Sequence, residues 1–192
     1  YREAAVGNPD VRWETVTKFN LGADYAILDG LFAGSVEYFR DDRKDILVRG
    51  GDRAVPSYFG ATPPTANLGR VRTEGYEIEL RINKVLSNGL RLWAEMSMTH
   101  AQNEILERDD PALFDAYRKQ AGYSIGQTRA YVDGGFVNTY DELYGSPQHD
   151  TNDGYKVPGD YYVIDFNADG VVDTKDLVPY GYSNAPQNTY NS

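Results

Sequence analysis

Two runs of alternating apolar and polar residues flank the dipeptide Asn88-Gly89, and this segment, from Gly75 to His100, restricts the fold more than any other. Asn-Gly readily adopts the positive φ angles of a tight hairpin turn. Side chains two apart on a strand share one face, so each run has an apolar and a polar face. The apolar faces comprise Tyr76, Ile78, Leu80 and Ile82 in the first run and Leu90, Leu92, Ala94, Met96 and Met98 in the second. The segment therefore predicts an antiparallel hairpin.

The second face of this hairpin is charged along its length, with Glu77, Glu79, Arg81 and Glu95 among its residues. The charged face must contact water or side chains of opposite charge. The continuous apolar face must be covered by other apolar groups. Two architectures satisfy both demands: a sheet with one solvated face, and a transmembrane barrel with lipid outside and a polar interior.

The same period-two pattern extends over the first half of the chain. It predicts four strands, at Trp13–Tyr25, Leu31–Arg40, Val71–Asn83 and Leu90–Ala101. Short turns at Asp29-Gly30 and Asn88-Gly89 alternate with a Gly- and Pro-rich connection over residues 50–67. Short turns on one side and long loops on the other are typical of outer-membrane barrels. The expected fold is all-β, a segment of a large antiparallel transmembrane β-barrel with long extracellular loops.

Residues 102–192 are rich in Gly, Asn, Asp and Tyr and lack sustained alternation. We therefore expect a second part of the chain here, a long loop region that follows the four strands of residues 1–101. A loop of this length is usually functional or disordered, and its many aromatic residues favour a folded loop. Asp110 as an N-cap, with Pro111 in the first turn, predicts one short helix over residues 110–118.

The composition argues against several functional classes. The 192 residues carry a formal net charge of -10, which would repel a phosphate backbone, so we expect no nucleic-acid partner. With no cysteine and two histidines, little remains for a zinc site or a nucleophilic triad. Adjacent acids such as Asp109/Asp110 and Asp141/Glu142 point apart on an extended chain, whereas glycosidase acids face each other across the substrate. We expect no enzymatic activity.

Residues 165–176 follow the pattern of a calcium-binding loop, with oxygen-bearing side chains at loop positions 1, 3, 5, 9 and 12 and Gly170 at the sharp turn. Calcium is a hard cation that prefers oxygen ligands. The predicted ligands are Asp165, Asn167, Asp169, the carbonyl of Val171, Asp173 and Asp176. The last acid is shorter than the Glu usual at that position. A structural calcium ion is the predicted cofactor, and an Asx-rich turn without an ion is the alternative.

A series of short motifs runs along nearly the whole chain. They are Asn8-Pro9-Asp10-Val11-Arg12-Trp13-Glu14, Asn20-Leu21-Gly22, Val55-Pro56-Ser57-Tyr58, Asn67-Leu68-Gly69-Arg70-Val71, Gly75-Tyr76-Glu77-Ile78-Glu79-Leu80, Gly126-Gln127, Tyr131-Val132-Asp133-Gly134-Gly135-Phe136, Pro158-Gly159-Asp160, the 165–176 loop and Gly181-Tyr182-Ser183. Their order and spacing resemble the C-terminal part of SusC/RagA-type TonB-dependent outer-membrane transporters. Thr73 departs from the Asn that this family often has there, a change from which we expect little consequence.

The resemblance implies both a fold and a function. The family's barrel is plugged from inside and imports nutrients such as oligosaccharides or peptides across the bacterial outer membrane. Its implied partners are a SusD-like surface lipoprotein, the TonB complex, the ligand and outer-membrane lipid. The turns at Asp29-Gly30 and Asn88-Gly89 would face the periplasm, and residues 50–67 and 102–192 would be extracellular. The plug, the TonB-contacting segment and most strands are absent here, so the resemblance implies a fragment.

One other function stays open from the residues alone. A calcium-stabilised surface β module that binds carbohydrate would also account for the tyrosine-rich loops and the calcium-type loop. A closed core between two sheets would favour this alternative, whereas an open sheet with one apolar face would favour the barrel segment.

Overall fold

The computed structural model describes residues 7–55, 58, 60–149 and 156–191. By its contacts the chain divides into two compact units, which we describe separately. The sheet unit comprises Tyr1–Leu113, Gln120–Gly126 and Ser183–Ser192, and the loop unit comprises Phe114–Lys119 and Gln127–Tyr182. Pro56 and Ser57, part of one motif singled out above, lie outside the described residues.

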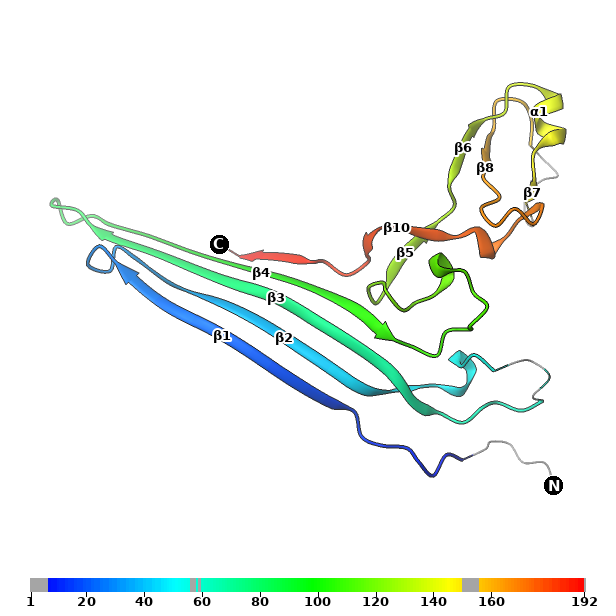
Figure 1. The fold of residues 1–192 in the computed structure, drawn as a ribbon. Helices are drawn as coiled ribbons and strands as arrows, with labels where there is room; N and C mark the ends of the chain where they lie inside the picture. The colour runs from blue at the N-terminus through cyan, green and yellow to red at the C-terminus, as the bar shows by residue number, and fades with distance from the viewer. Residues whose placement is uncertain (1–6, 56–57, 59, 150–155, 192) are drawn as a thin grey trace. The chain divides into compact units, whose positions relative to one another are not determined.

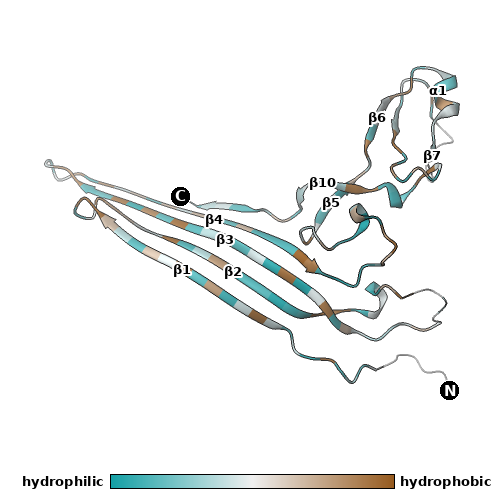
Figure 2. Ribbon diagram, viewed as in Figure 1, coloured by the Kyte–Doolittle hydropathy of each residue, from teal (hydrophilic) through white to brown (hydrophobic). Residues whose placement is uncertain are grey.

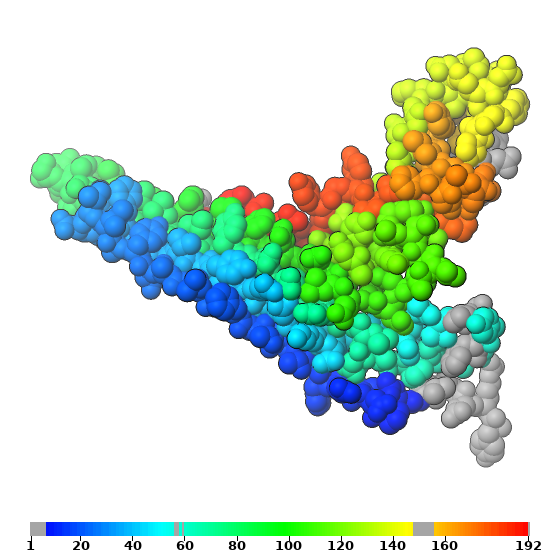
Figure 3. Space-filling model, in the orientation of Figure 1, coloured from blue at the N-terminus to red at the C-terminus, as the bar shows by residue number. Residues whose placement is uncertain are grey.

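The sheet unit is built on one antiparallel sheet of five strands, in the order β1-β2-β3-β4-β11 (Figure 1). The strands are β1 (Thr15–Ile27), β2 (Phe32–Val48), β3 (Ala66–Val85), β4 (Arg91–Glu107) and β11 (Asn188–Asn191). A short 3-10 helix, η1 (Gly50–Asp52), lies in the connection between β2 and β3. In Figure 3 the neighbouring strands of this sheet, from blue to green, form one continuous surface.

Both predicted tight turns are present. At the β1–β2 turn Leu28, Asp29 and Gly30 all have positive φ, and the N–H of Leu31 donates to the carbonyl of Leu28 at 3.1 Å. At the β3–β4 turn Gly89 has φ 81°, a value that glycine adopts without steric cost. The sequence signals Asp-Gly and Asn-Gly therefore mark the hairpins correctly.

All four predicted strands form, but each of them extends beyond at least one of its expected ends. The largest extension is in β2, which continues through the charged run at residues 40–45 to Val48. Cross-strand ion pairs stabilise this extension: Lys18 forms an ion pair with Asp41 at 3.2 Å, and Arg72 forms one with Asp42 at 3.1 Å. Opposite charges on neighbouring strands stabilise a sheet, so the run is strand and not loop.

The fifth strand, β11, was not expected. It lies within the predicted loop region and pairs with β4, with Tyr190 opposite Met98 and Asn188 opposite His100. Because β11 returns to the sheet and β4 continues to Glu107, the compact units do not divide at residue 101. The short helix expected over residues 110–118 does not form, and only the 3-10 turn η3 (Ala116–Arg118) is found there. The carboxylate of Asp110 instead accepts from the backbone N–H groups of Gln120 and Ala121.

The loop unit is folded through short pairings. Its elements are η3, β5 (Gln127–Ala130), β6 (Asp133–Phe136), α1 (Tyr140–Gly145), β7 (Gln148–His149), β8 (Tyr161–Val163), β9 (Val171–Val172), η5 (Thr174–Asp176) and β10 (Val178–Ser183). β5 pairs with β10, β6 pairs antiparallel with β8, and β7 pairs parallel with β9 (Figure 1).

Few apolar side chains are buried among the described residues. Val48 and Ile105 are buried in the sheet unit, and Val137 and Val172 in the loop unit. The long strands therefore do not enclose a core of their own. No helix in the described ranges has both the length and the apolar character that crossing a membrane requires.

Candidate functional site

The sheet carries an apolar band on one face. Residues directly opposite each other on paired strands project to the same side, so the register identifies each face. Val36, Ile78 and Met98 form one row of the band, and Gly34, Leu80 and Met96 the next. The full band comprises Leu21, Ala23, Ile27, Phe32, Val36, Ile78, Leu80, Ile82, Leu92, Ala94, Met96 and Met98. Figure 2 shows the resulting alternation of hydrophobic and hydrophilic colour along these strands.

The band is exposed in the sheet unit, as Leu21 at 65% and Met96 at 46% show. A contiguous apolar surface of this kind requires a lipid or protein surface to cover it. The predicted apolar face is therefore confirmed, and among the described residues of the sheet unit no second sheet packs on it to form a closed core.

An aromatic row closes the band at the end away from the hairpin turns. Tyr38, Tyr76 and His100 lie directly opposite one another on β2, β3 and β4. The rings of Tyr76 and His100 are stacked, with centroids 5.1 Å apart, and Nδ1 of His100 lies 2.7 Å from Oδ1 of Asn188 on β11. Amphipathic rings at the edge of an apolar band are the arrangement found where a barrel wall meets the membrane surface.

The opposite face of the sheet is polar, as expected. Arg81 lies opposite Glu95 and bonds it at 3.2 Å, and it also bonds Glu79 at 3.2 Å. Glu37 lies directly opposite Glu77. Like charges at such a position destabilise a sheet in isolation, so this face suits a wet surface or one that meets positive charge. Between the hairpin turns and the aromatic row, apolar side chains thus gather on one face and most charged side chains on the other.

The predicted metal ligands of the acidic loop, residues 165–176, all lie in the loop unit. Asp176 is fully buried, and its carboxylate accepts from the backbone N–H groups of Phe166, Asn167 and Asp173 at 2.8, 3.1 and 2.8 Å. These three bonds tie the two ends of the loop together. An ionised carboxylate that accepts several N–H bonds is strongly held, because each bond is charge-assisted.

The first half of the loop is closed by its own side chains. Asp165 accepts from the N–H groups of Asp169 and Gly170 at 3.2 and 2.7 Å, and Asn167 Oδ1 accepts from Asp169 at 2.9 Å. The N–H of Val171 donates to Asp169 Oδ1 at 3.1 Å. Side-chain oxygens of the loop thus accept backbone N–H groups within the loop itself. Across the described ranges, however, no three His, Asp or Glu side chains are grouped so as to hold a metal ion.

Lys175 supplies a positive charge inside the acidic loop. Its ammonium lies 2.7 Å from Asp173 and 3.1 Å from Asp169. Hydrogen bonds from Lys175 hold the pKa of both carboxyls below its usual range, and the same bonds raise the pKa of Lys175. Lys175 was not among the predicted site residues, although a lysine two positions after Asp173 is a visible sign of an internal ion pair.

These shifts predict how the loop responds to pH. A carboxyl group whose pKa is lowered stabilises the loop above the usual carboxyl pKa of about 3.9, and this contribution is lost as the pH falls through the lowered value. A lysine whose pKa is raised stabilises the loop below the usual lysine pKa of about 10.4, and this contribution is lost as the pH rises through the raised value. Lys175→Met should remove the ammonium contribution and move the acid transition of the loop to higher pH. Hydrogen–deuterium exchange of residues 165–176 across pH measures this, with Lys119→Met as the control. An unchanged acid transition would contradict the ion-pair account.

Tyr117 anchors the acidic loop to the segment that contains η3. Its hydroxyl donates to the carbonyl of Lys175 at 2.9 Å, and its ring meets Phe166 edge-on at a centroid distance of 4.8 Å. Burial raises the pKa of the Tyr117 hydroxyl, which stays a donor at neutral pH. Arg129 in turn bonds the backbone carbonyls of Tyr117 and Lys119. Sequence spacing gave no signal for this contact, because its members are far apart in the chain.

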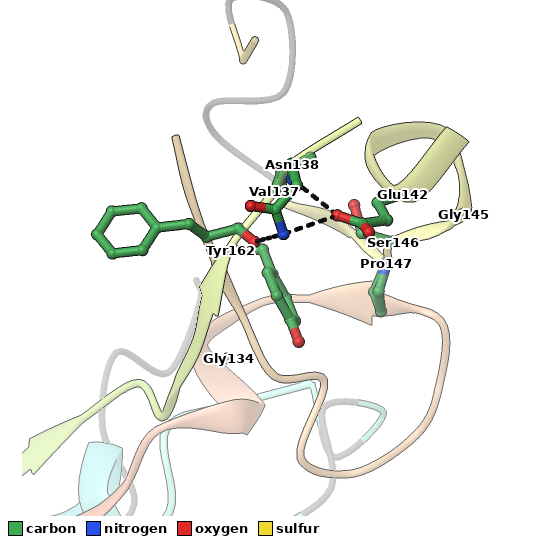
Figure 4. Close-up of a pocket in the computed structure, with 9 residues that line it drawn as sticks. Gly134, Val137, Asn138, Glu142, Gly145, Ser146, Pro147 and Tyr162 are labelled. Atoms are coloured by element: carbon green, nitrogen blue, oxygen red, sulfur yellow. Dashed lines mark hydrogen bonds between the residues drawn. The ribbon is translucent and has the colours of Figure 1, made fainter. Parts of the chain in front are cut away.

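A surface pocket of about 510 Å³ lies between α1 and the β6–β8 pair (Figure 4). Glu142 is fixed at its edge, since its carboxylate accepts from the backbone N–H of Asn138 at 2.7 Å and from the Asn138 side chain at 3.3 Å. The ring of Tyr162 packs against Gly134, where an added Cβ would lie 2.2 Å from the ring. An aromatic ring beside an oriented carboxylate and amide is suited to a small ligand with both apolar and polar parts.

Comparisons with known proteins agree with this geometry. The family model described as TonB dependent receptor-like, beta-barrel matches residues 1–191. The TonB-dependent receptor SusC of Bacteroides thetaiotaomicron is 25% identical over 182 residues, which are 90% of this chain and 17% of SusC. A TonB-dependent receptor of Formosa agariphila is 22% identical over 185 residues, 91% of this chain and 18% of that receptor.

Solved structures show the same fold. The RagAB peptide importer in its open-open state aligns with a TM-score of 0.66 and 16% identity, over 99% of this chain and 20% of the RagAB chain. The chain thus spans less than a fifth of the length of the two receptors and a fifth of the aligned RagAB chain.

Proposed function

Because the chain belongs to the family of TonB dependent receptor-like β-barrels, we propose that it forms part of the wall of an outer-membrane transporter that imports a nutrient. One observation carries this proposal: the separation of an exposed apolar band from a charged face along four long strands. A barrel wall needs lipid on one side and a polar interior on the other. In this placement Ile78 and Leu80 face lipid, whereas Glu77 and Arg81 face the lumen.

The same proposal orients the chain in the membrane. The two tight turns, at Asp29-Gly30 and Asn88-Gly89, face the periplasm. The connection over residues 50–67 and the region from 102 to 192 lie on the extracellular side. The aromatic row then marks the extracellular edge of the apolar layer, which is supported by the position of this row at the far end of the band from the turns.

The imported nutrient is an oligosaccharide or a peptide, captured with a SusD-like surface lipoprotein and moved with energy from the TonB complex through regions outside this chain. The names of the relatives, SusC and the RagAB peptide importer, support this class of ligand. The pocket beside Glu142 and Tyr162 offers one contact point for it.

Transport of this kind needs no covalent chemistry, and three of the four acids in the adjacent pairs have structural partners. Asp109 bonds Arg53 at 3.3 Å, and Asp110 accepts two backbone N–H groups. Glu142 accepts from Asn138 beside the N-terminus of α1. A calcium-stabilised binding module is not favoured either, because the long strands form one open sheet and not a closed two-sheet core.

Cell fractionation tests the proposal directly. The complete protein should sediment with outer membranes, and its migration on a gel should change when it is heated, as folded barrels do. A protein found in the soluble fraction would overturn the barrel assignment and restore the binding module.

We also propose that the acidic loop binds a structural calcium ion. The all-oxygen donor set of Asp165, Asn167, Asp169, the Val171 carbonyl, Asp173 and Asp176 suits a hard cation. Since the Lys175 ammonium already bonds Asp169 and Asp173, calcium has to displace it. Lys175→Met should therefore bind calcium more tightly than the unmodified protein, and Asp165→Ala more weakly. Titration calorimetry with calcium chloride measures both, and no heat of binding in any variant would refute the site.

A further inference from the structure

We propose that the pocket between α1 and the β6–β8 pair binds a primary ammonium group, carried by a short peptide. The inference rests on the proposed function in one respect, because it assigns this pocket to the capture of the imported nutrient. The pocket has a volume of about 510 Å³, which lies within the range of small-ligand sites and accommodates the first residues of a peptide.

Backbone hydrogen bonds fix the frame of the pocket. Val137, which lines it, is buried. The N–H of Val137 donates to the carbonyl of Asp160 at 2.8 Å, and its carbonyl accepts from the N–H of Gly159 at 2.7 Å. The first turn of α1 is fixed as well, because the hydroxyl oxygen of Thr139 accepts from the N–H of Glu142 at 3.2 Å. A preformed frame of this kind has little ordering cost when a ligand binds.

Two acceptor atoms in this frame remain free to bind a donor. Oε2 of Glu142 accepts from the backbone N–H of Asn138 at 2.7 Å and from its Nδ2 at 3.3 Å, which orients both side chains (Figure 4). Within the described part of the chain, Oε1 of Glu142 and Oδ1 of Asn138 accept no hydrogen bond. An ammonium group has three donors and no acceptor, so a carboxylate oxygen beside an amide oxygen suits it.

Apolar groups line the pocket next to these acceptors. The ring of Tyr162 lies on one side of the space and Pro147 on the other, and Val137 also lines it (Figure 4). An amino sugar carries hydroxyl groups around its ammonium, and these groups would lose their hydrogen bonds with water against apolar walls. A peptide can carry an apolar side chain beside its terminal ammonium. The lining therefore favours a peptide over an amino sugar.

The charge of the loop unit favours a cationic group over an anionic one. Acidic residues outnumber basic residues in the segments that form this unit, and the whole chain has a formal net charge of -10. Such a field attracts cations and repels anions. The ammonium end of a peptide should therefore enter the pocket, while its carboxylate end projects away from the protein.

The test is saturation-transfer difference NMR of the complete protein, titrated with the tripeptide Leu-Gly-Gly or with its N-acetylated form, in which the amine is blocked. Acetylation should weaken binding about tenfold, the lower end of what a charge-assisted bond contributes, because Glu142 is exposed. Glu142→Gln, whose amide oxygen still accepts from Asn138, should weaken binding of Leu-Gly-Gly by the same factor. It should leave binding of the acetylated peptide unchanged, because the two changes remove the same contact.

Asp141→Asn is the matched control. Asp141 lies in the same first turn of α1, but it is not among the residues that line the pocket. This variant should bind both peptides like the unmodified protein. N-acetyl-Lys-Gly-Gly, whose amine is on the side chain, identifies the source of the ammonium group. Binding as tight as that of Leu-Gly-Gly would extend the site to lysine side chains, and weaker binding would restrict it to the peptide N-terminus.

Several outcomes would overturn the inference: no binding of Leu-Gly-Gly, equal binding of its acetylated form, unchanged binding in Glu142→Gln, or an equal loss in Asp141→Asn. Tighter binding of glucosamine than of Leu-Gly-Gly would contradict the peptide assignment. Heat-modifiable migration, measured on the same samples, keeps the two proposals apart. Loss of that behaviour in the unmodified protein would count against the barrel, whereas its presence without peptide binding would count against the ammonium site alone.

Discussion

Replacing Ile78 with arginine should destabilise the assembled protein by about 2–4 kcal/mol, the cost measured for a cationic side chain at the middle of a lipid-facing strand. Ile78 lies in the central row of the apolar band, between Val36 and Met98. An arginine there would have to desolvate its charge in lipid or disturb both neighbouring strands. Chemical unfolding of the complete protein in lipid vesicles gives the free energy directly, and the yield of folded protein in the outer membrane gives a second readout.

Thr99→Arg is the matched control for that change. Thr99 lies next to Met98 on β4 but projects to the polar face, directly opposite Glu77. The same arginine should there be neutral or slightly stabilising, because it meets a carboxylate in a wet environment. If both variants lost the same stability, the apolar band would not face lipid.

Gly75→Ala should destabilise the sheet by about 1–3 kcal/mol, the usual cost of forcing an extra methyl group into a packed site. Gly75 is buried in β3, and a Cβ there would lie 2.1 Å from the backbone carbonyl oxygen of His100 and 2.7 Å from the ring of Phe39. The first contact is with backbone, which cannot move without separating β3 from β4. Urea unfolding of the complete protein measures the loss.

Gly22→Ala provides the comparison within the same sheet. A Cβ at Gly22 in β1 would meet its nearest atoms, in Val36 and Glu37, at 3.7 Å, an ordinary contact distance. Alanine should therefore cost nothing there, and the smaller flexibility of the unfolded chain favours it slightly. Equal losses at the two positions would show that general strand propensity, and not the close approach at Gly75, sets the effect.

Period-two alternation was sufficient to predict the four long strands and their faces. Ile78, Leu80 and Ile82 share one side of β3 because side chains on a strand must alternate, whatever surrounds them. The turns were predictable for a similar reason, since Gly30 and Gly89 have φ angles that favour glycine. Local geometry alone fixes these features.

The missed features depend on contacts between distant residues. β11 has only four residues and no alternation of its own. It forms a strand because it pairs with the free edge of β4. The predicted second strand stopped at Arg40, whereas β2 continues through the charged run, whose partners Lys18 and Arg72 lie on other strands. In the acidic loop the contacts of Lys175 and Tyr117 were missed, because they follow from tertiary placement and not from spacing.

The short pairing of β11 with β4 has a consequence for the order of assembly. β1 to β4 are joined in sequence by turns and one modest connection, so their pairing closes small loops and can occur early. The β4–β11 pair joins His100 to Asn188, and the residues of the loop unit lie between them in the sequence. Slow folding of the loop unit would thus delay this pairing and leave the edge of β4 open to aggregation.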